Sequence, residues 1–221
     1  MPEYKAILFD MDGTLVNTEP LHEEAWHQTL DPFNINLSED WFNKYTGSTD
    51  RVLINDISKQ YQIHLDVDEL LEKKRNVFLK LAQTRSQVFG GVREGLERLS
   101  KIYDLALVTS SSRKGAVCVL EAVDLSKFFK TTITFDDVEK HKPDPEPYLK
   151  AINYFGIMPQ DCIAVEDSFS GSKSAKTAGC YTIGVLNSVE ADKLESADRI
   201  FESTKDVMKF LVGIHHQNDR S

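Results

Sequence analysis

The sequence predicts a doubly wound α/β fold, in which a parallel sheet lies between layers of helices, with a small helical domain inserted near the N-terminus. Short apolar runs that stop abruptly at acidic, hydroxyl or glycine residues alternate with longer helical segments. This alternation is typical of buried parallel strands joined by crossover helices. Residues 18–88 break the alternation, which predicts a separate helical insert.

Four apolar runs are short enough to be buried strands. They cover residues 6–9, 105–108, 163–165 and 181–185. Helical segments are expected between and after them, over residues 115–123, 146–155 and 171–178. In such sheets ligands bind at the carboxyl ends of the strands, so the residues that directly follow each run are the first candidates for function.

The insert contains only helical patterns. Leu21, Ala25 and Trp26 recur at helical spacing, and a second series runs from Val67 to Leu81. The turn signal at residues 89–91 marks the return to the main domain. These boundaries predict a core of residues 1–17 and 89–214, an insert of residues 18–88, and a polar, flexible tail of residues 215–221.

Charge and composition exclude several classes of function. The net charge of −9 and the isoelectric point near 5.2 argue against nucleic acid as the main partner, because a phosphate backbone attracts a basic surface. The N-terminus lacks the apolar stretch of a signal peptide, and no run approaches membrane-spanning length. The three cysteines are widely spaced and are expected to be reduced thiols. We therefore expect a cytoplasmic protein without a membrane or an obligate protein partner.

Two aspartates directly follow the first strand. Residues two apart on an extended segment face the same way, so Asp10 and Asp12 project together, and Gly13 permits a sharp turn after them. Neighbouring carboxylates repel each other unless a cation or a proton intervenes, and Mg²⁺ prefers such oxygen ligands. The alternative is a loop of acidic residues that cap a helix.

Polar residues also follow two later strands. Thr109 and Ser110 come after the strand at 105–108, where hydroxyl and backbone N–H groups favour anion binding. Glu166 and Asp167 come after the strand at 163–165 and repeat the acidic pattern of the first strand. Helix capping is the alternative for both segments.

Lys142 precedes Pro143, which keeps the lysine on an extended segment of restricted conformation. A lysine held in this way can place its ammonium at a fixed point, whereas an ordinary exposed lysine is the alternative. Because these segments are expected at one edge of one sheet, together they indicate an anion site with a divalent cation.

These segments resemble the four motifs of the haloacid dehalogenase (HAD) superfamily. The run Phe9-Asp10-Met11-Asp12-Gly13-Thr14-Leu15 is similar to motif I of its phosphotransferase members. Thr109, Lys142 and the pair Glu166-Asp167 are similar to motifs II, III and IV, in the same order and over nearly the whole chain. The resemblance implies a Rossmann-like core, and the insert resembles the helical cap of subclass I, as in β-phosphoglucomutase and small sugar phosphatases.

The resemblance also implies roles for these residues. Asp10 is expected to attack phosphorus and form an aspartyl-phosphate, and Asp12 to act as the general acid and base. Thr109 and Lys142, beside Ser110, are expected to hold the transferring phosphoryl group. The expected Mg²⁺ ligands are Asp10, Glu166, Asp167 and the backbone carbonyl of Asp12.

The expected activity is hydrolysis of small phosphorylated metabolites such as sugar phosphates. A phosphomutase and a phosphate-binding protein without turnover are the alternatives, and Asp12 disfavours a dehalogenase. Expected substrate-selecting residues of the cap are Thr18, His22 and the loop 46–51, which includes Asp50 and Arg51. Asp50 stands where the resemblance to a mutase would place an arginine, which favours the hydrolase.

Overall fold

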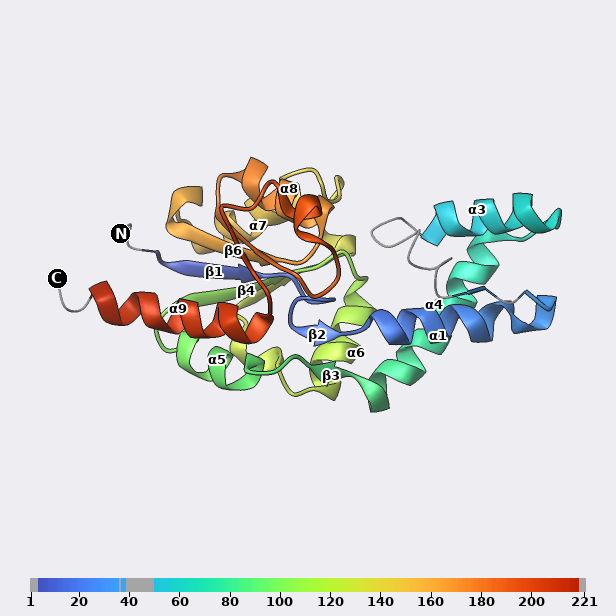
Figure 1. Ribbon diagram of the computed structural model, residues 1–221, viewed down its shortest axis with the longest axis horizontal. Helices are drawn as coiled ribbons and strands as arrows, with labels where there is room; N and C mark the ends of the chain where they lie inside the picture. The colour runs from blue at the N-terminus through green and yellow to red at the C-terminus, as the bar shows by residue number, and fades with distance from the viewer. Residues whose placement is uncertain (1–3, 36, 39–49, 219–221) are drawn as a thin grey trace. The chain divides into compact units, whose positions relative to one another are not determined.

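The computed structural model describes residues 4–35, 37–38 and 50–218 of the 221-residue chain, with side chains up to Ile214. The chain forms two compact units (Figure 1). The core unit consists of Met1–Asn17 and Gln87–Ser221, and the cap unit consists of Thr18–Ser86.

The core unit is built on a six-stranded sheet in the order β5-β4-β1-β6-β7-β8, and every pair of neighbouring strands is parallel. This arrangement confirms the predicted fold class. The strands are β1 (Ala6–Phe9), β4 (Asp104–Val108), β5 (Thr131–Ile133), β6 (Cys162–Glu166), β7 (Tyr181–Val185) and β8 (Arg199–Phe201).

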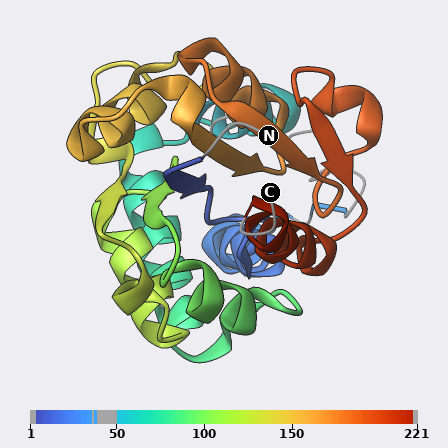
Figure 2. The ribbon, with the colours of Figure 1, turned by 90° about the vertical axis from the view of Figure 1, so that its left-hand side faces the viewer.

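Helices cover both faces of this sheet. Figures 1 and 2 show α7 and α8 on one face and α5, α6 and α9 on the other. The helices are α5 (Val92–Leu99), α6 (Arg113–Ala122), α7 (Glu146–Phe155), α8 (Phe169–Ala178) and α9 (Thr204–Asn218). Because both faces are covered, every residue of β1 and β6 is buried, and these central strands appear in the sequence as uninterrupted apolar runs.

Short elements complete the core unit. The 3-10 helices are η2 (Ser126–Phe128), η3 (Phe135–Asp137), η4 (Pro159–Asp161) and η5 (Ala191–Leu194). Strands β2 (Val16–Asn17) and β3 (Gln87–Val88) form an antiparallel pair. Because β3 pairs with β2, the chain returns to the core at Gln87, two residues earlier than the sequence analysis places the boundary.

The cap unit is helical in the part that the structure describes. Its elements are α1 (Glu19–Leu30), η1 (Asp31–Phe33), α3 (Asp50–Tyr61) and α4 (Val67–Arg85). A buried cluster that includes Trp26, Leu30, Ile54 and Leu70 holds these helices together. Across residues 4–35, 37–38 and 50–218, no helix is both long and apolar enough to cross a membrane.

The order of the strands places the site. From β1 the chain proceeds to β4 and β5 on one side, and then crosses to β6, β7 and β8 on the other. Phe9, the last residue of β1, is in register with Leu107 on one side and Val165 on the other. The residues that follow β1, β4 and β6 therefore meet at the switch point of the sheet, where α/β proteins of this type bind ligands.

Candidate active site

Asp10 lies at the centre of a buried group of carboxylates. Its backbone N–H continues the sheet by donating to the carbonyl of Val165, at 3.0 Å. One carboxylate oxygen from each of Asp10, Glu166 and Asp167 lies within 4.8 Å of the other two. Burial and the neighbouring carboxylates hold the pKa of Asp10 well above its ordinary range, although Lys142 acts in the opposite direction.

Asp167 faces the turn that follows β1. The hydroxyl of Thr14 donates to Asp167 Oδ1 at 2.9 Å, and Gly13 leaves space for the other oxygen. A Cβ atom at position 13 would lie 2.0 Å from Asp167 Oδ2, and the φ of +75° also favours glycine. Burial, followed by the charge of Glu166, raises the pKa of Asp167 to about 7.

Lys142 provides the positive charge of the site. Its Nζ donates to Asp10 Oδ1 at 2.7 Å, to Glu166 Oε1 at 2.5 Å and to the carbonyl of Val108 at 2.8 Å. An ammonium has three donors, so all of them are used. Burial acts to lower the pKa of Lys142, but the two carboxylates outweigh it and raise the pKa above its ordinary value.

Glu166 is fully buried and is held on every side. Besides Lys142, the hydroxyl of Tyr148 donates to Oε1 at 2.7 Å and that of Ser168 to Oε2 at 3.2 Å. A Cβ atom at Gly171 would lie 2.0 Å from this carboxylate. The sequence analysis names neither Tyr148 nor Gly171, because their contact with Glu166 depends on how α7 and α8 pack against β6.

The carboxylate of Asp12 is not part of the group that Asp10, Glu166 and Asp167 form. Its Oδ2 accepts hydrogen bonds from the hydroxyls of Ser111 at 2.7 Å and Thr109 at 3.2 Å, both in the loop after β4. The backbone N–H of Ser111 donates to Thr109 Oγ1 at 3.0 Å, and Ser110 is exposed. The sequence analysis does not name Ser111 as a site residue. The metal ligand that it expects from Asp12 is the backbone carbonyl, and this stays a prediction.

Two residues near the C-terminus brace the turn after β1. Asn187 Nδ2 donates to the carbonyl of Gly13 at 2.8 Å and to Thr204 Oγ1 at 2.7 Å. Thr204 Oγ1 in turn donates to the carbonyl of Thr14 at 2.7 Å. These bonds fix the residues that face Asp167, and their distance along the chain explains why sequence patterns do not reveal them.

Residues of the cap unit form a second polar cluster around Lys74, which is buried. Its Nζ lies 3.0 Å from Asp50 Oδ2 and 3.1 Å from His22 Nδ1, and the indole of Trp26 donates to Asp50 Oδ1 at 3.3 Å. The ring of His22 also stacks on Phe78, with 4.1 Å between centroids. Burial, and then the charge of Lys74, hold the pKa of His22 well below its ordinary value.

The other expected cap residues are placed differently. Thr18 is buried directly before α1. Arg51 pairs with Asp68 at 2.6 Å, and both side chains are exposed on the cap unit. Residues 46–49 of the expected loop lie outside the described residues. Lys74 was seen in the sequence only as one position of a helical pattern.

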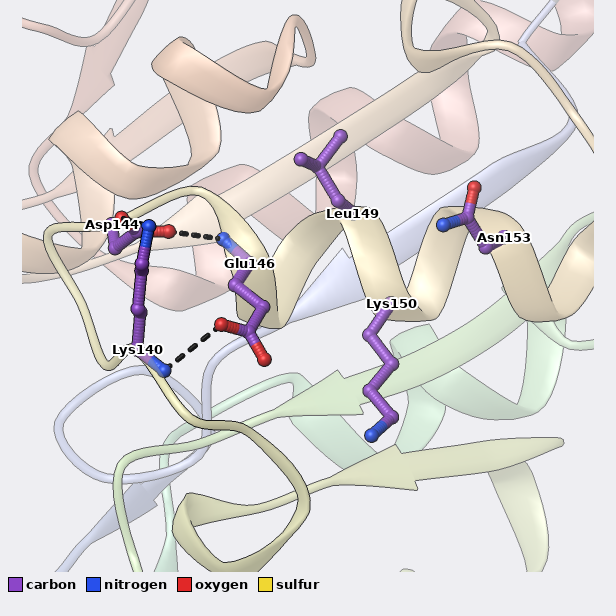
Figure 3. A pocket seen from close by; sticks show the side chains of 6 residues that line it. All are labelled: Lys140, Asp144, Glu146, Leu149, Lys150 and Asn153. Atoms are coloured by element: carbon purple, nitrogen blue, oxygen red, sulfur yellow. Dashed lines mark hydrogen bonds and ion pairs between the residues drawn. The ribbon is translucent and has the colours of Figure 1, made fainter.

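A surface hollow of about 440 Å³ lies along α7 (Figure 3). The residues that line it include positively and negatively charged side chains. They are Lys140, Asp144, Glu146, Leu149, Lys150 and Asn153. None of the candidate site residues lines it. We therefore place the candidate site at the carboxylate cluster.

The carboxylate cluster fits a hard divalent cation. Three oxygen donors from Asp10, Glu166 and Asp167 lie close together in a buried place where their charges repel. Such ligands suit Mg²⁺ and similar ions, and the absence of a side chain at Gly13 leaves room for the carboxylate of Asp167.

Comparison with known proteins shows which family the chain matches. Residues 7–185 match the model of the haloacid dehalogenase-like hydrolases. A phosphorylated carbohydrates phosphatase of Thermotoga maritima is 34% identical, over 86% of this chain and 88% of its own. A phosphoglycolate phosphatase of Escherichia coli is 29% identical, over 99% and 97%.

Solved structures agree with these relatives. A structure from Haemophilus somnus, described as a predicted phosphoglycolate phosphatase, has a TM-score of 0.84 at 27% identity, and covers 95% of this chain and 99% of its own. The β-phosphoglucomutase of Clostridium difficile shares the fold, with a TM-score of 0.78 at 21% identity over 96% and 98%. The match over most of the chain confirms the resemblance seen in the sequence: the protein belongs to the haloacid dehalogenase-like hydrolases.

Proposed function

We propose that this protein is a Mg²⁺-dependent phosphatase that hydrolyses small phosphorylated carbohydrates through an aspartyl-phosphate on Asp10. The observation that carries the proposal is the enclosed contact of the Lys142 ammonium with Asp10, among three clustered carboxylates. The relatives named as phosphatases of phosphorylated carbohydrates and of phosphoglycolate support the class of substrate.

In the first half-reaction, a carboxylate oxygen of Asp10 attacks phosphorus and the ester P–O bond breaks. Asp12, in its protonated form, gives its proton to the leaving alkoxide. The hydroxyls of Ser111 and Thr109 hold the carboxyl group of Asp12 on the side of the β4 loop, separate from the metal ligands. This separation supports different roles for the two aspartates.

In the second half-reaction, water attacks the phosphorus of the aspartyl-phosphate, and the bond between phosphorus and the Asp10 oxygen breaks. Asp12, now a carboxylate, accepts the proton of the water and returns to its starting form. Phosphate leaves, and the carboxylate of Asp10 is restored.

Charge must be neutralised for an anionic nucleophile to approach an anionic phosphate. Asp10, Glu166 and Asp167 would hold Mg²⁺, which when bound neutralises charge and polarises the phosphoryl oxygens. Lys142 exchanges one of its present carboxylate contacts for the phosphoryl group, because its three donors are otherwise used. Tyr148 and Ser168 keep Glu166 in place during this exchange.

The contacts within the cap unit favour a hydrolase over a phosphomutase. A mutase must grip the second phosphate of a bisphosphate intermediate with cations. Here Asp50 neutralises Lys74 at 3.0 Å, and Asp68 neutralises Arg51 at 2.6 Å. Both cations are thus neutralised within the cap unit, which leaves them less able to grip a second phosphate.

The proposal is tested by supplying β-glucose 1-phosphate with a trace of the bisphosphate and following both products. Steady release of inorganic phosphate with little glucose 6-phosphate is expected. A panel of other phosphorylated carbohydrates and phosphoglycolate then identifies the preferred substrate by kcat/KM. Rapid formation of glucose 6-phosphate with negligible free phosphate would make the protein a mutase.

A further inference from the structure

An aromatic stack adjoins the turn that carries Lys142. The rings of Phe135, in η3, and His141 are parallel to within 7°, with 3.7 Å between their centroids. His141 directly precedes Lys142, and its carbonyl accepts the N–H of Asp144 at 2.9 Å. The turn of residues 141–144 is therefore closed by a hydrogen bond and held at its first residue by the ring of Phe135.

Phe135 is itself fixed to the loop that holds Asp12. Its N–H donates to the carbonyl of Ser111 at 3.0 Å, and the hydroxyl of Ser111 donates to Asp12 at 2.7 Å. Contacts through Phe135 and His141 thus connect the loop after β4, which holds Asp12, to the turn that carries Lys142.

The segment that carries Phe135 is well supported. The N–H and hydroxyl of Thr134 both donate to Asp137 Oδ2, at 2.8 Å and 2.6 Å, which forms a capping box around η3. The guanidinium of Arg113 donates to the same carboxylate and to the carbonyl of Thr132. Phe135 therefore offers the ring of His141 a fixed surface.

The other end of the turn has its own anchor. The hydroxyl of Ser174, which is fully buried in α8, donates to the carbonyl of Asp144 at 2.5 Å. The backbone around Lys142 is thus held between α8 and η3. Since nearly half of Phe135 is exposed (46%), its ring adds little to the core, and its contact with His141 is a local one.

We propose that Phe135 and His141 are positioning residues, which hold the turn of Lys142 so that its ammonium meets the phosphoryl group. The inference rests on the proposed function. Neither ring acts on the reacting atoms, and both act through the backbone of residues 141–144. A displacement of about 1 Å at a reacting group costs up to roughly a hundredfold in rate. Because all substrates share the phosphoryl group, the loss should not depend on the leaving group.

The test compares variants on an aryl phosphate and on a hexose 6-phosphate. Phe135→Ala and His141→Ala are each expected to lower kcat on the order of tenfold to a hundredfold on both substrates, with little change in KM. His141→Phe and Phe135→Tyr keep the stacked rings and should retain a kcat near that of the wild type. Tyr154→Ala is the matched control, because Tyr154 is an exposed aromatic residue (60%) that contacts Phe155 instead.

A double-mutant cycle separates this role from a merely structural one. In a Lys142→Ala background, Phe135→Ala should not lower kcat any further, since its effect on the reaction passes through Lys142. The inference would be overturned if Phe135→Ala lowered kcat as much in the Lys142→Ala protein as in the wild type. It would also be overturned if Phe135→Ala lowered kcat only on the hexose phosphate. If Phe135→Ala does not fold, the contrast between His141→Ala and His141→Phe decides.

The proposed function and this inference fail in different ways. A wild-type protein that releases no phosphate from any phosphomonoester overturns both. An active wild type whose Phe135→Ala and His141→Ala variants are fully active overturns only the positioning role.

Discussion

Lys142 Nζ lies 2.7 Å from Asp10 Oδ1, and the two side chains are almost wholly removed from solvent, with exposures of 4% and 9%. A buried pair of this kind is costly to break, because removing one partner leaves the other charge buried without compensation. Here the loss would affect more than one group, since the same ammonium also contacts Glu166. The contact therefore links the stability of the core to the chemistry of the site.

Lys142→Ala should lower both stability and activity. It leaves Asp10 and Glu166 facing each other without a cation, so we expect a loss of about 3 kcal/mol or more in the free energy of unfolding. We also expect kcat for an aryl phosphate to fall on the order of 10² to 10³-fold, as when a donor to the transition state is removed. Urea unfolding and phosphate release measure the two effects.

The matched control for this variant is Lys140→Ala. Lys140 lies two residues away on the same segment, but its side chain is exposed (72%) and its nearest ion pair is a long one, 4.0 Å from Asp144. Stability and kcat should remain close to those of the wild type. Similar losses from both lysines would contradict a special role for Lys142.

Gly13→Ala should abolish activity even if the protein folds. The added Cβ would lie 2.0 Å from Asp167 Oδ2 and would displace a proposed metal ligand. Gly156→Ala is the control, because Gly156 has a similar φ of +66° but nothing within 4 Å of a Cβ. It should cost about 1 to 2 kcal/mol of stability, from backbone strain alone, and leave kcat unchanged. Full activity of Gly13→Ala would exclude Asp167 from the metal site.

Removal of divalent cations should stop phosphate release, and Mg²⁺ should restore it. Binding should also raise the Tm, because the cation relieves the repulsion among Asp10, Glu166 and Asp167. Asp167→Asn should weaken this rise in Tm, while the metal-free variant should be at least as stable as the metal-free wild type. Ca²⁺ should bind and inhibit, since its looser coordination spoils in-line attack. Undiminished activity after thorough chelation would refute the metal site.

Acidification should destabilise the cap unit through His22. Burial and Lys74 lower the pKa of His22 in the folded protein, so the unfolded chain binds this proton first. The stability contributed by neutral His22 is present above about pH 6.5, the ordinary value for histidine, and is lost as the pH falls below it. His22→Asn keeps an acceptor for Lys74 but cannot titrate. Its Tm should therefore fall less than that of the wild type between pH 7 and pH 5, and equal slopes would refute the assignment.

The sequence predicted the central part of the fold because the central strands are buried on both faces. β1, β4, β6 and β7 appear as apolar runs for that reason. The edge strands β5 and β8 have three residues each and contain exposed or half-exposed positions, so they carry no such signal. Helices α6 and α8 begin two residues earlier than expected, because Ser112 and Ser168 cap them by accepting the N–H groups of Gly115 and Gly171.

The residues of the candidate site also differ in whether the sequence could indicate them. Asp10, Thr109 and Asp167 directly follow strands and Glu166 is the last residue of one, so local position was enough to single them out. Tyr148 reaches Glu166 from α7, and Asn187 reaches Gly13 from 174 residues away, so these contacts exist only after packing. The side on which Asp12 is held likewise depends on Ser111 in another loop.

The most direct test of the account is chemical trapping of the phosphorylated enzyme. The protein is quenched during turnover of an aryl phosphate and treated with borohydride, which reduces an acyl phosphate to the alcohol. Mass spectrometry should then find homoserine at position 10, only when substrate and Mg²⁺ are both present, and Asp10→Asn should release no phosphate. Steady phosphate release without any modification at position 10, or an active Asp10→Asn protein, would contradict the central claim that Asp10 is the nucleophile.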